Sequence, residues 1–210
     1  MKASLQTVVL VGLFASLSAC AEGVAQQGAD DPDFDPAAAS DAALTDPHPA
    51  GAHDAHHALP TLPGGVDLEG AFLGTDGAET GTVMIAETPN GLLVRVDVRG
   101  VEHGFHGVHL HETGLCEPAE GFKTAGGHAN PDGSEHGFFV PGGPHVGDLP
   151  NAYAHQEGHI RTDLFKADAR LADVADADGF AVMVHSGADD YESQPSGAAG
   201  SRVACAPFPG

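Results

Sequence analysis

Apolar and polar residues alternate with a period of two in several short segments beyond residue 65. Residues 66–73, 81–87 and 92–98 follow this pattern, which is typical of antiparallel strands with one buried face. A Pro-Asn-Gly sequence at residues 89–91 separates the last two segments and predicts a hairpin turn. Further strands are predicted at residues 107–112, 151–163, 180–185 and 201–204.

This part of the chain has no long amphipathic helical pattern, and residues 167–175 predict only a brief helical turn. Short strands separated by turns rich in Gly, Pro, Asn and Asp are typical of all-β proteins. Residues 66–210, about 145 in number, therefore indicate a single all-β domain, either a sandwich or a barrel.

Residues 20–65 follow neither a helical nor an alternating pattern. They are rich in Ala, Asp, Pro and Gly and have few large apolar residues, which predicts a disordered acidic tether. Four histidines in the tether could bind a divalent metal loosely, or they could be incidental to a solvated linker, and the sequence leaves both alternatives open. These histidines are His48, His53, His56 and His57.

The first 19 residues have the pattern of a secretion signal, with Lys2 followed by an apolar run. The run is shorter than the roughly 20 residues that a membrane-spanning helix requires. It ends in Leu-Ser-Ala before Cys20, which resembles the cleavage box of bacterial lipoproteins; the alternative is an ordinary signal peptide. We therefore expect an exported protein in the periplasm or cell envelope, anchored to the membrane by lipid on Cys20.

The chain has 3 cysteines, an odd number for an exported protein. If Cys20 carries lipid, Cys116 and Cys205 remain to form a disulfide, as the oxidising compartment favours. Such a bond would close a loop of about 90 residues, for which the chain-entropy model gives roughly 4 kcal/mol of stabilisation.

The formal net charge is -22, and no Lys or Arg occurs between Lys2 and Arg95. An acidic surface of this kind repels the phosphates of nucleic acids and anionic lipid headgroups. The charge therefore argues against a nucleic-acid-binding protein, and it leaves the lipid on Cys20 as the expected membrane contact.

Candidate metal ligands are concentrated in the second half of the chain. His109 and His111 are two residues apart in a predicted strand, so both side chains are expected on one face. His185 ends another predicted strand. The long Gly- and Pro-rich loop between the cysteine at 116 and residue 151 contains the other candidates, which are His128, His136, His145 and Asp148.

Each of these features alone has a simpler explanation. A His-x-His pair is a weak signal, a histidine at a strand end usually packs, and a His-rich loop can scavenge metal. Together, however, imidazoles and a carboxylate in this order suit two adjacent sites for copper and zinc. We expect metal binding to supply the order that packing does not give the loop.

Six short motifs resemble those of the copper,zinc superoxide dismutases, and specifically their exported bacterial branch. The resemblance covers residues 66–208 and depends on the joint order of the motifs. They are HGVHLH at 106–111, AGGHANP at 125–131, HG at 136–137, GPHVGDL at 143–149, MVH at 183–185 and GSRVAC at 200–205.

The resemblance implies a Greek-key β-barrel or sandwich of about eight antiparallel strands with long metal-binding loops. It also implies one copper and one zinc ion per subunit, bridged by the imidazolate of His128. The implied copper ligands are His109, His111, His128 and His185. The implied zinc ligands are His128, His136, His145 and Asp148.

The remaining family motifs imply roles for other residues. Asp189 would link the two metal sites through hydrogen bonds, and His106 would be a buried structural residue. Arg202 would guide superoxide to copper, the alternative being a surface arginine in a salt bridge. Cys116 and Cys205 match the family's disulfide, in agreement with the cysteine count.

The implied activity is conversion of superoxide to dioxygen and hydrogen peroxide by alternating reduction and oxidation of copper, with His128 and Arg202 as catalytic residues. The alternative is a non-enzymatic extracytoplasmic buffer for copper and zinc. The complete ligand set and Arg202 favour the enzyme. The chain departs from the family in the loop after Asp189, which has no lysine to serve as a second guiding residue. It also departs at residues 206–210, which leaves both a monomer and a homodimer open.

Overall fold

The structure, a computed structural model, describes residues 62 and 64–210. The predicted signal peptide, Cys20 and the four tether histidines lie outside the described residues. In the part of the chain that is described, no helix has the length and apolar character needed to cross a bilayer.

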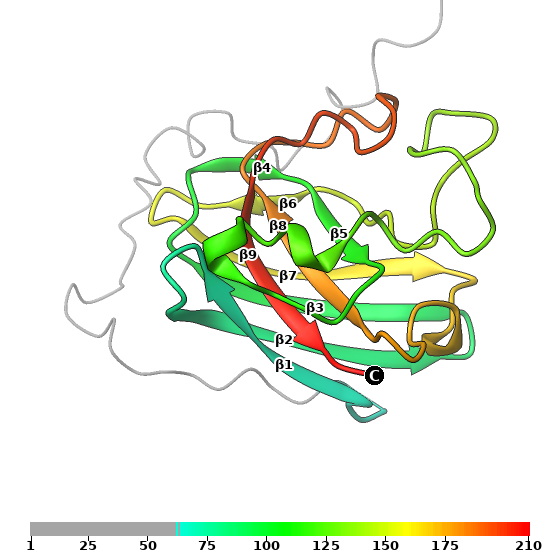
Figure 1. Cartoon of the computed structure of the whole chain (residues 1–210), viewed down its shortest axis with the longest axis horizontal. Coiled ribbons are helices and arrows are strands. Elements are labelled where there is room, and N and C mark those ends of the chain that lie inside the picture. Colours follow the sequence, from blue (N-terminus) through cyan, green and yellow to red (C-terminus); the bar gives the residue numbers. More distant parts are fainter. Residues whose placement is uncertain (1–61, 63) are drawn as a thin grey trace, which may run out of the picture. The chain divides into compact units, whose positions relative to one another are not determined.

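Nearly all the regular secondary structure of the described domain consists of antiparallel strands (Figure 1). A sheet of seven strands has the order β5-β8-β9-β1-β2-β3-β7, and β4 pairs with β6 in a second, two-stranded sheet. The larger sheet curls around the core, so the predicted all-β class is confirmed. The strands are β1 (Leu68–Gly74), β2 (Glu79–Thr88), β3 (Gly91–Arg99), β4 (Gly104–His106), β5 (Val108–His111), β6 (Ala152–Ala154), β7 (His159–Ala167), β8 (Phe180–His185) and β9 (Arg202–Phe208).

The alternating pattern explains which face of each strand is buried. In β3, Leu92, Val94, Val96 and Val98 are all 0% exposed, whereas Arg95 projects outward and pairs with a carboxylate of β7. Burying one such apolar side chain contributes about 1.5–3 kcal/mol, so this strand is a principal part of the core. The predicted hairpin is also confirmed, because Thr88 pairs with Gly91 across a two-residue turn.

Two strand predictions needed correction. Residues 151–163 were expected to form one strand, but the chain turns after β6 and changes partner, from β4 for β6 to β3 for β7. Hydrogen bonds from His155 N–H to His159 O and from Gly158 N–H to His155 O close this turn. Gly158 has φ +69, and an added Cβ would lie 2.4 Å from Val101 O, so a glycine is required there.

The strand expected at 107–112 is confirmed as β5, and Gly107 separates it from the short β4. The last strand, expected at 201–204, instead extends to Phe208. The helical turn expected within 167–175 is present as the short 3-10 helix η3 (Leu171–Asp173). Two further 3-10 turns, η1 (Pro118–Glu120) and η2 (Lys123–Ala125), lie in the loop after β5.

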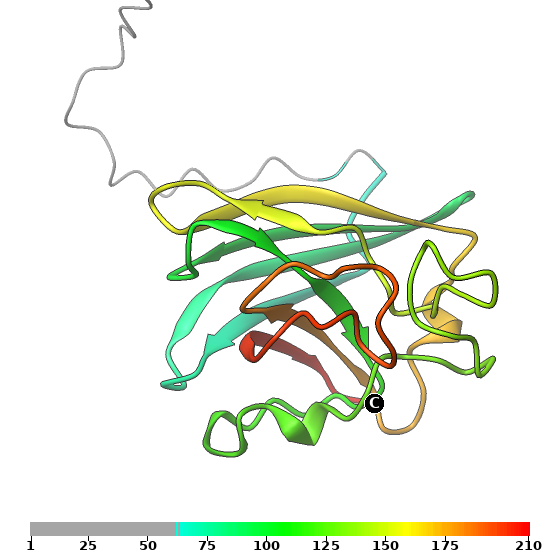
Figure 2. The same ribbon diagram turned by 90° about the horizontal axis from the view of Figure 1, so that it is seen from above.

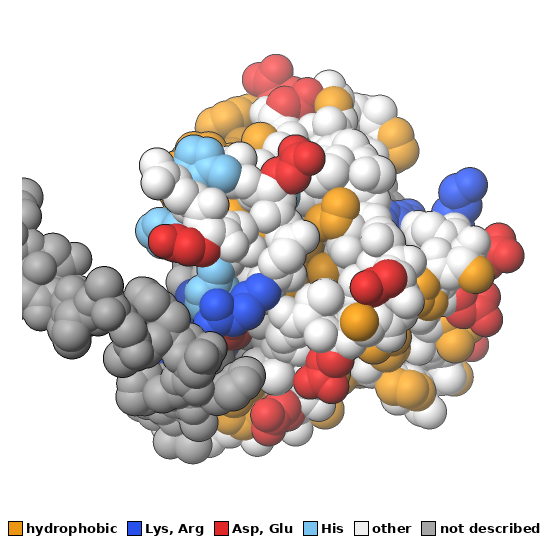
Figure 3. All heavy atoms as spheres, turned by 90° about the vertical axis from the view of Figure 1, so that its left-hand side faces the viewer, with side chains coloured by type: hydrophobic (Ala, Val, Ile, Leu, Met, Phe, Trp, Pro, Cys, Tyr) orange, Lys and Arg blue, Asp and Glu red, His pale blue; other side chains and the backbone are white. Residues whose placement is uncertain are grey.

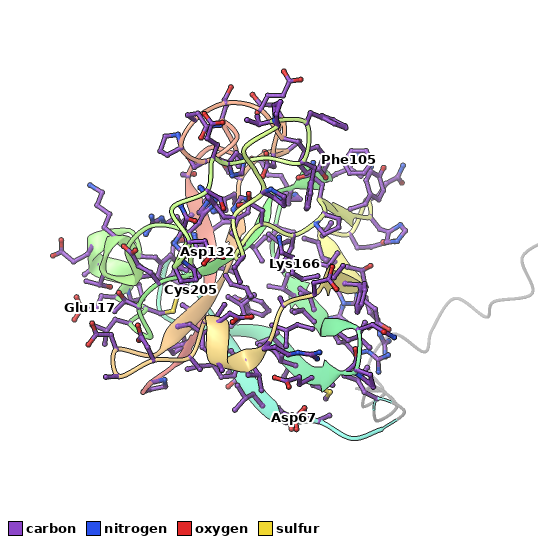
Figure 4. All side chains as sticks on the ribbon, turned by 90° about the vertical axis from the view of Figure 1, so that its right-hand side faces the viewer. Asp67, Phe105, Glu117, Asp132, Lys166 and Cys205 are labelled. Carbon is purple, nitrogen blue, oxygen red and sulfur yellow. A yellow bond between two sulfur atoms is a disulfide. The ribbon has the colours of Figure 1, made fainter. Side chains whose placement is uncertain are left out.

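The predicted disulfide is confirmed between Cys116 and Cys205. It ties the loop after β5 to β9, and Cys205 is labelled in Figure 4. Cys205 packs with Phe122, Ala125 and Met183 in a small apolar cluster separate from the main core. This cluster and the disulfide together hold residues 112–126 against β8 and β9.

Candidate metal centre

Two groups of buried side chains converge at the edge of the sheet formed by β5 and β8. Within each group, the candidate ligand atoms all lie within 4.8 Å of one another. The first group is His109, His111, His128 and His185, and the second is His128, His136, His145 and Asp148. The structure therefore brings together all seven residues that the sequence singled out, and His128 belongs to both groups.

Strand register places the first group. His109 and His111 lie on β5, and β5 pairs with β8 so that Val108 is opposite Val184, one residue before His185. A register shift between Val184 and His185 then sets His185 opposite Arg202 of β9. The predicted same-face pair on β5 is thus completed by a histidine from the neighbouring strand.

The long loop is ordered by backbone hydrogen bonds along the free edge of β5. Ala129 N–H donates to Leu110 O, Leu110 N–H donates to Gly147 O, and Gly147 N–H donates to Ala129 O. An added Cβ on Gly147 would lie 2.2 Å from Leu110 O, so only glycine allows this approach. The expectation that metal binding orders the loop was therefore incomplete, because pairing with β5 also orders it. The loop between β8 and β9 lies beside this long loop (Figure 2), and His136 N–H donates to Gln194 Oε1 across them.

Each residue of the first group has one buried ring nitrogen without a hydrogen-bond partner. These atoms are His109 Nδ1, His111 Nε2, His128 Nε2 and His185 Nε2. Within residues 62 and 64–210, every other buried side-chain nitrogen or oxygen has a hydrogen-bond partner. Buried polar atoms are nearly always paired, so four unpartnered nitrogens facing one point require an explanation. A four-nitrogen site for copper supplies one, and the donor set suits that metal.

The opposite ring nitrogens are fixed by acceptors. His109 Nε2 lies 2.7 Å from Asp189 Oδ2, His111 Nδ1 lies 3.1 Å from Gly126 O, and His185 Nδ1 lies 3.4 Å from Gly200 O. Because a carbonyl or carboxylate oxygen can only accept, each of these nitrogens carries the proton, and the unpartnered nitrogen presents its lone pair. Hydrogen bonds of this kind orient metal-binding imidazoles.

The second group is centred on the carboxylate of Asp148. Its Oδ1 lies 2.9 Å from His128 Nδ1, 3.0 Å from His136 Nδ1 and 3.2 Å from His145 Nδ1. Its Oδ2 accepts the N–H groups of Gly137 and His145 at 3.0 and 2.9 Å, which fixes the carboxylate. Three imidazole nitrogens and one carboxylate oxygen form the donor set that zinc binds tetrahedrally.

Burial keeps three imidazoles of the first group neutral. It lowers the pKa of His109 to about 4 and the pKa of His185 to about 3, and it holds the pKa of His111 well below its usual range. Burial alone would raise the pKa of Asp148, but hydrogen bonds from His128 and from the Gly137 N–H outweigh it, so this pKa lies well below its usual range. At neutral pH the groups therefore have the protonation states that metals bind.

Asp189 connects the two groups. It is 3% exposed, and its two carboxylate oxygens accept hydrogen bonds from His109 Nε2 at 2.7 Å and from His136 Nε2 at 3.0 Å. Burial would raise its pKa, but the hydrogen bond from His109 and its other partners lower the pKa to about 2. The structure therefore places Asp189 where the family resemblance implies it, between one residue of each group.

Arg202 lies beside the first group and does not form the salt bridge considered as the alternative. Its Nη1 and Nη2 donate to Phe122 O and Gly126 O, both at 2.6 Å. Among the described residues, no carboxylate oxygen lies within 4.0 Å of its guanidinium. The positive charge is therefore held by two backbone carbonyls. Burial lowers the pKa of Arg202, and the carboxylate of Glu112, which lies farther away, acts in the opposite direction.

The sequence reading missed three residues that support the groups. Gln194 forms a pair of 2.8 Å hydrogen bonds with the backbone of His136, its Oε1 accepting from N–H and its Nε2 donating to the carbonyl. Asn151 makes a similar reciprocal pair with the backbone of Asp189. Lys166 donates to the carbonyl of His145. No spacing rule marks such residues, because each acts through the backbone of a distant segment.

His106 is buried at 2% exposure, with Nδ1 at 2.6 Å from His185 O and Nε2 at 2.7 Å from Glu102 O. It holds the backbone of His185 and its ring nitrogens face no other member of the two groups, in keeping with the structural role that the resemblance implies.

An antiparallel β-barrel with two adjoining groups of buried imidazoles and a shared histidine defines a binuclear metalloprotein. Comparison with known proteins specifies the family: residues 79–208 match the family model of copper/zinc superoxide dismutase (SODC). The chain belongs to this family, whose cofactors are copper and zinc.

Individual relatives agree with the family match. The chain is 37% identical over 140 residues to superoxide dismutase [Cu-Zn] 2 of Aquifex aeolicus, covering 64% of this chain and 81% of the relative. Among solved structures, a double mutant of a superoxide dismutase-like protein from Bacillus subtilis superposes with a TM-score of 0.64 at 34% identity, covering 68% of this chain and 97% of that one. Cu/Zn superoxide dismutase from Brucella abortus gives a TM-score of 0.57 at 31% identity, covering 67% and 97%.

Proposed function

We propose that the protein is a superoxide dismutase that converts superoxide to dioxygen and hydrogen peroxide at a Cu,Zn site. The observation that carries this proposal is the set of four buried, unpartnered imidazole nitrogens beside a second group centred on Asp148. We assign one copper ion to His109, His111, His128 and His185. We assign one zinc ion to His128, His136, His145 and Asp148.

Copper, when bound, supplies the one-electron redox change. Zinc undergoes no redox change, so its role is to order the loop and to tune the electronic properties of the shared imidazole. The overall reaction consumes two superoxide anions and two protons and yields one dioxygen and one hydrogen peroxide. His128 is the residue suited to proton handling, because its Nε2 is buried and has no protein partner. This nitrogen has one lone pair, which would hold either copper or a proton, so in its protonated form it can supply the proton that the peroxide product requires.

Arg202 has the position and charge to attract the anionic substrate. The chain as a whole carries a formal charge of -22, but the screening length at physiological salt is about 8 Å, so distant carboxylates contribute little at the site. Acidic side chains are scattered across the face shown in Figure 3 instead of forming one cluster. The guanidinium beside the first group, which has no ion-pair partner within 4.0 Å, is therefore expected to dominate the local field.

The experiment is an assay of superoxide removal by the metal-loaded protein alongside Arg202→Ala. We expect an active parent and a variant whose second-order rate constant is about 10-fold lower at low ionic strength, with a weaker dependence on salt. Arg202→Lys should recover part of the rate because it keeps the charge. Arg161→Ala, which removes an exposed cation from the outer face of β7, is the control and should remain close to the parent.

The competing function is a copper and zinc buffer without catalysis. A buffer has no use for an unpaired arginine at the copper group, and the complete ligand set favours the enzyme. A parent that binds both metals but does not remove superoxide would establish the buffer, and an unimpaired Arg202→Ala variant would remove the guiding role from Arg202.

We propose further that the protein is exported and anchored in the cell envelope by lipid on Cys20, after cleavage of residues 1–19. The Leu-Ser-Ala-Cys sequence supports this proposal. Incorporation of radiolabelled palmitate into the parent but not into Cys20→Ser tests it.

We propose that the protein assembles as a homodimer. Sedimentation equilibrium should then give twice the subunit mass, and a single subunit mass would exclude the dimer.

The tether histidines are proposed to assist metal acquisition. Deleting residues 46–58, which removes His48, His53, His56 and His57, should slow the recovery of activity when apo-protein is given limiting copper and zinc. Turnover of the fully loaded protein should be unchanged, because the deletion leaves the domain at residues 66–210 intact. Equal rates of loading in the parent and the deletion variant would refute this role.

A further inference from the structure

Lys166 occupies a position where a lysine is unexpected. Side chains of β7 alternate, and Lys166 lies on the same inward face as the buried residues Ile160 and Leu164. It is only 9% exposed. A buried ammonium group is costly unless it is hydrogen-bonded and paired, so its surroundings in the fold have to stabilise it.

All the contacts of the Lys166 ammonium lie in the loop that carries the proposed zinc ligands. Nζ donates to the backbone carbonyl of His145 at 2.5 Å and lies 5.6 Å from the centre of the Phe138 ring. Burial lowers the pKa of Lys166, while the carboxylate of Asp148 acts in the opposite direction. Figure 4 labels Lys166 near the centre of the molecule, beneath this loop.

The contact with His145 is significant because of where that carbonyl lies. His145 O also accepts the N–H of Asp148, at 3.3 Å, and so closes the turn that places two members of the second group. Lys166 therefore holds a backbone oxygen that helps to set the spacing between His145 and Asp148, together with the hydrogen bond from His145 N–H to Asp148 Oδ2. It does so from β7, a strand of the barrel wall that contributes no ligand.

Other ties of this loop come from the backbone of β5, from the loop after β8 or from the ligands themselves. Gln194 joins His136 to the loop after β8, and Asp189 belongs to that same loop. The side chain of Lys166 connects the His145–Asp148 turn to a regular strand, β7, through its hydrogen bond to His145 O.

We propose that Lys166 is a positioning residue for zinc, which fixes the turn from His145 to Asp148 in the geometry that the metal requires. The inference rests on the proposed assignment of zinc to the second group. It predicts that the side chain contributes to zinc affinity and not only to the stability of the barrel.

The test compares full-length parent, Lys166→Met, Lys166→Arg and Arg170→Met. Arg170 is the matched control, because it is a half-buried cation near the end of β7 that donates to Thr88 O and Pro89 O and not to the zinc loop. Zinc affinity is measured by competition with a chromophoric chelator. The visible spectrum of cobalt(II) bound in place of zinc reports the geometry of the second group.

Lys166→Met should bind zinc about 10- to 100-fold more weakly than the parent, the usual cost of losing a residue that orients metal ligands, and its cobalt spectrum should change. Lys166→Arg, which keeps the charge and a donor, should recover part of the affinity, and Arg170→Met should match the parent. Zinc should also raise the melting temperature less in Lys166→Met than in the parent.

Unchanged zinc affinity and an unchanged cobalt spectrum in Lys166→Met would overturn the proposal and leave Lys166 as a purely structural residue. If Lys166→Met does not fold, Lys166→Gln is judged by the same two measurements. A parent that binds no zinc at the second group would instead refute the proposed function, so the two failures are distinguishable.

Discussion

Replacing His185 with alanine should abolish superoxide removal while leaving zinc bound. The substitution deletes one of the four converging nitrogens of the first group, all of which are buried and unpartnered. It leaves the second group, which does not include His185, with its full donor set. We expect a loss of activity of roughly 100-fold or more, because removing a ligand costs at least as much as removing a residue that orients one.

The measurement is metal content by elemental analysis together with the rate of superoxide removal. The expected result is a protein with zinc near one equivalent, little copper and activity near background. His155→Ala is the control, since His155 is exposed and belongs to neither group. Full activity of His185→Ala would show that the first group is not where the reaction occurs.

Removing the disulfide should give the largest change in stability. Cys116 and Cys205 are 89 residues apart, and opening a loop of this length is expected to lower the free energy of unfolding by about 4 kcal/mol. Cys116→Ala combined with Cys205→Ala removes the bond, and unfolding in urea, monitored by circular dichroism, measures the loss. Cys205 is 0% exposed, so alanine there adds a small cavity cost.

The same bond is expected to affect the site. The loop that it ties down supplies Phe122 O and Gly126 O, which hold Arg202, and Gly126 O also accepts from His111. Reduced protein should therefore lose activity before it unfolds globally. A stability change below about 1 kcal/mol would contradict the chain-entropy account for this loop.

Much of the fold was predictable because one face of each strand is buried. The alternation in β2 and β3, and the Pro-Asn-Gly turn between them, are local signals, and the structure bears them out. The division of residues 151–163 into β6 and β7 was not predictable, because the change of partner from β4 to β3 is a property of the whole sheet. A period-two pattern persists through such a turn and does not reveal it.

The candidate site also contains residues that the sequence could predict and residues that it could not. His109 and His111 could be assigned to one face from spacing alone, and the order of the loop motifs indicated the other members. Gln194 and Lys166 could not be found, because each acts on the backbone of a segment distant in sequence. Lys166 was hidden further by its charge, since a lysine in an alternating strand is normally expected to face solvent.

The central claim is that the ring of His128 joins a copper ion to a zinc ion. Anomalous diffraction from crystals of the metal-loaded protein, recorded at the copper and zinc absorption edges, tests this claim most directly. We predict one copper peak at the first group and one zinc peak at the second, with the ring of His128 contacting both ions and the other ligands as assigned. A map in which this ring contacts only one ion or neither, or in which the copper edge gives no peak in fully loaded protein, would contradict it.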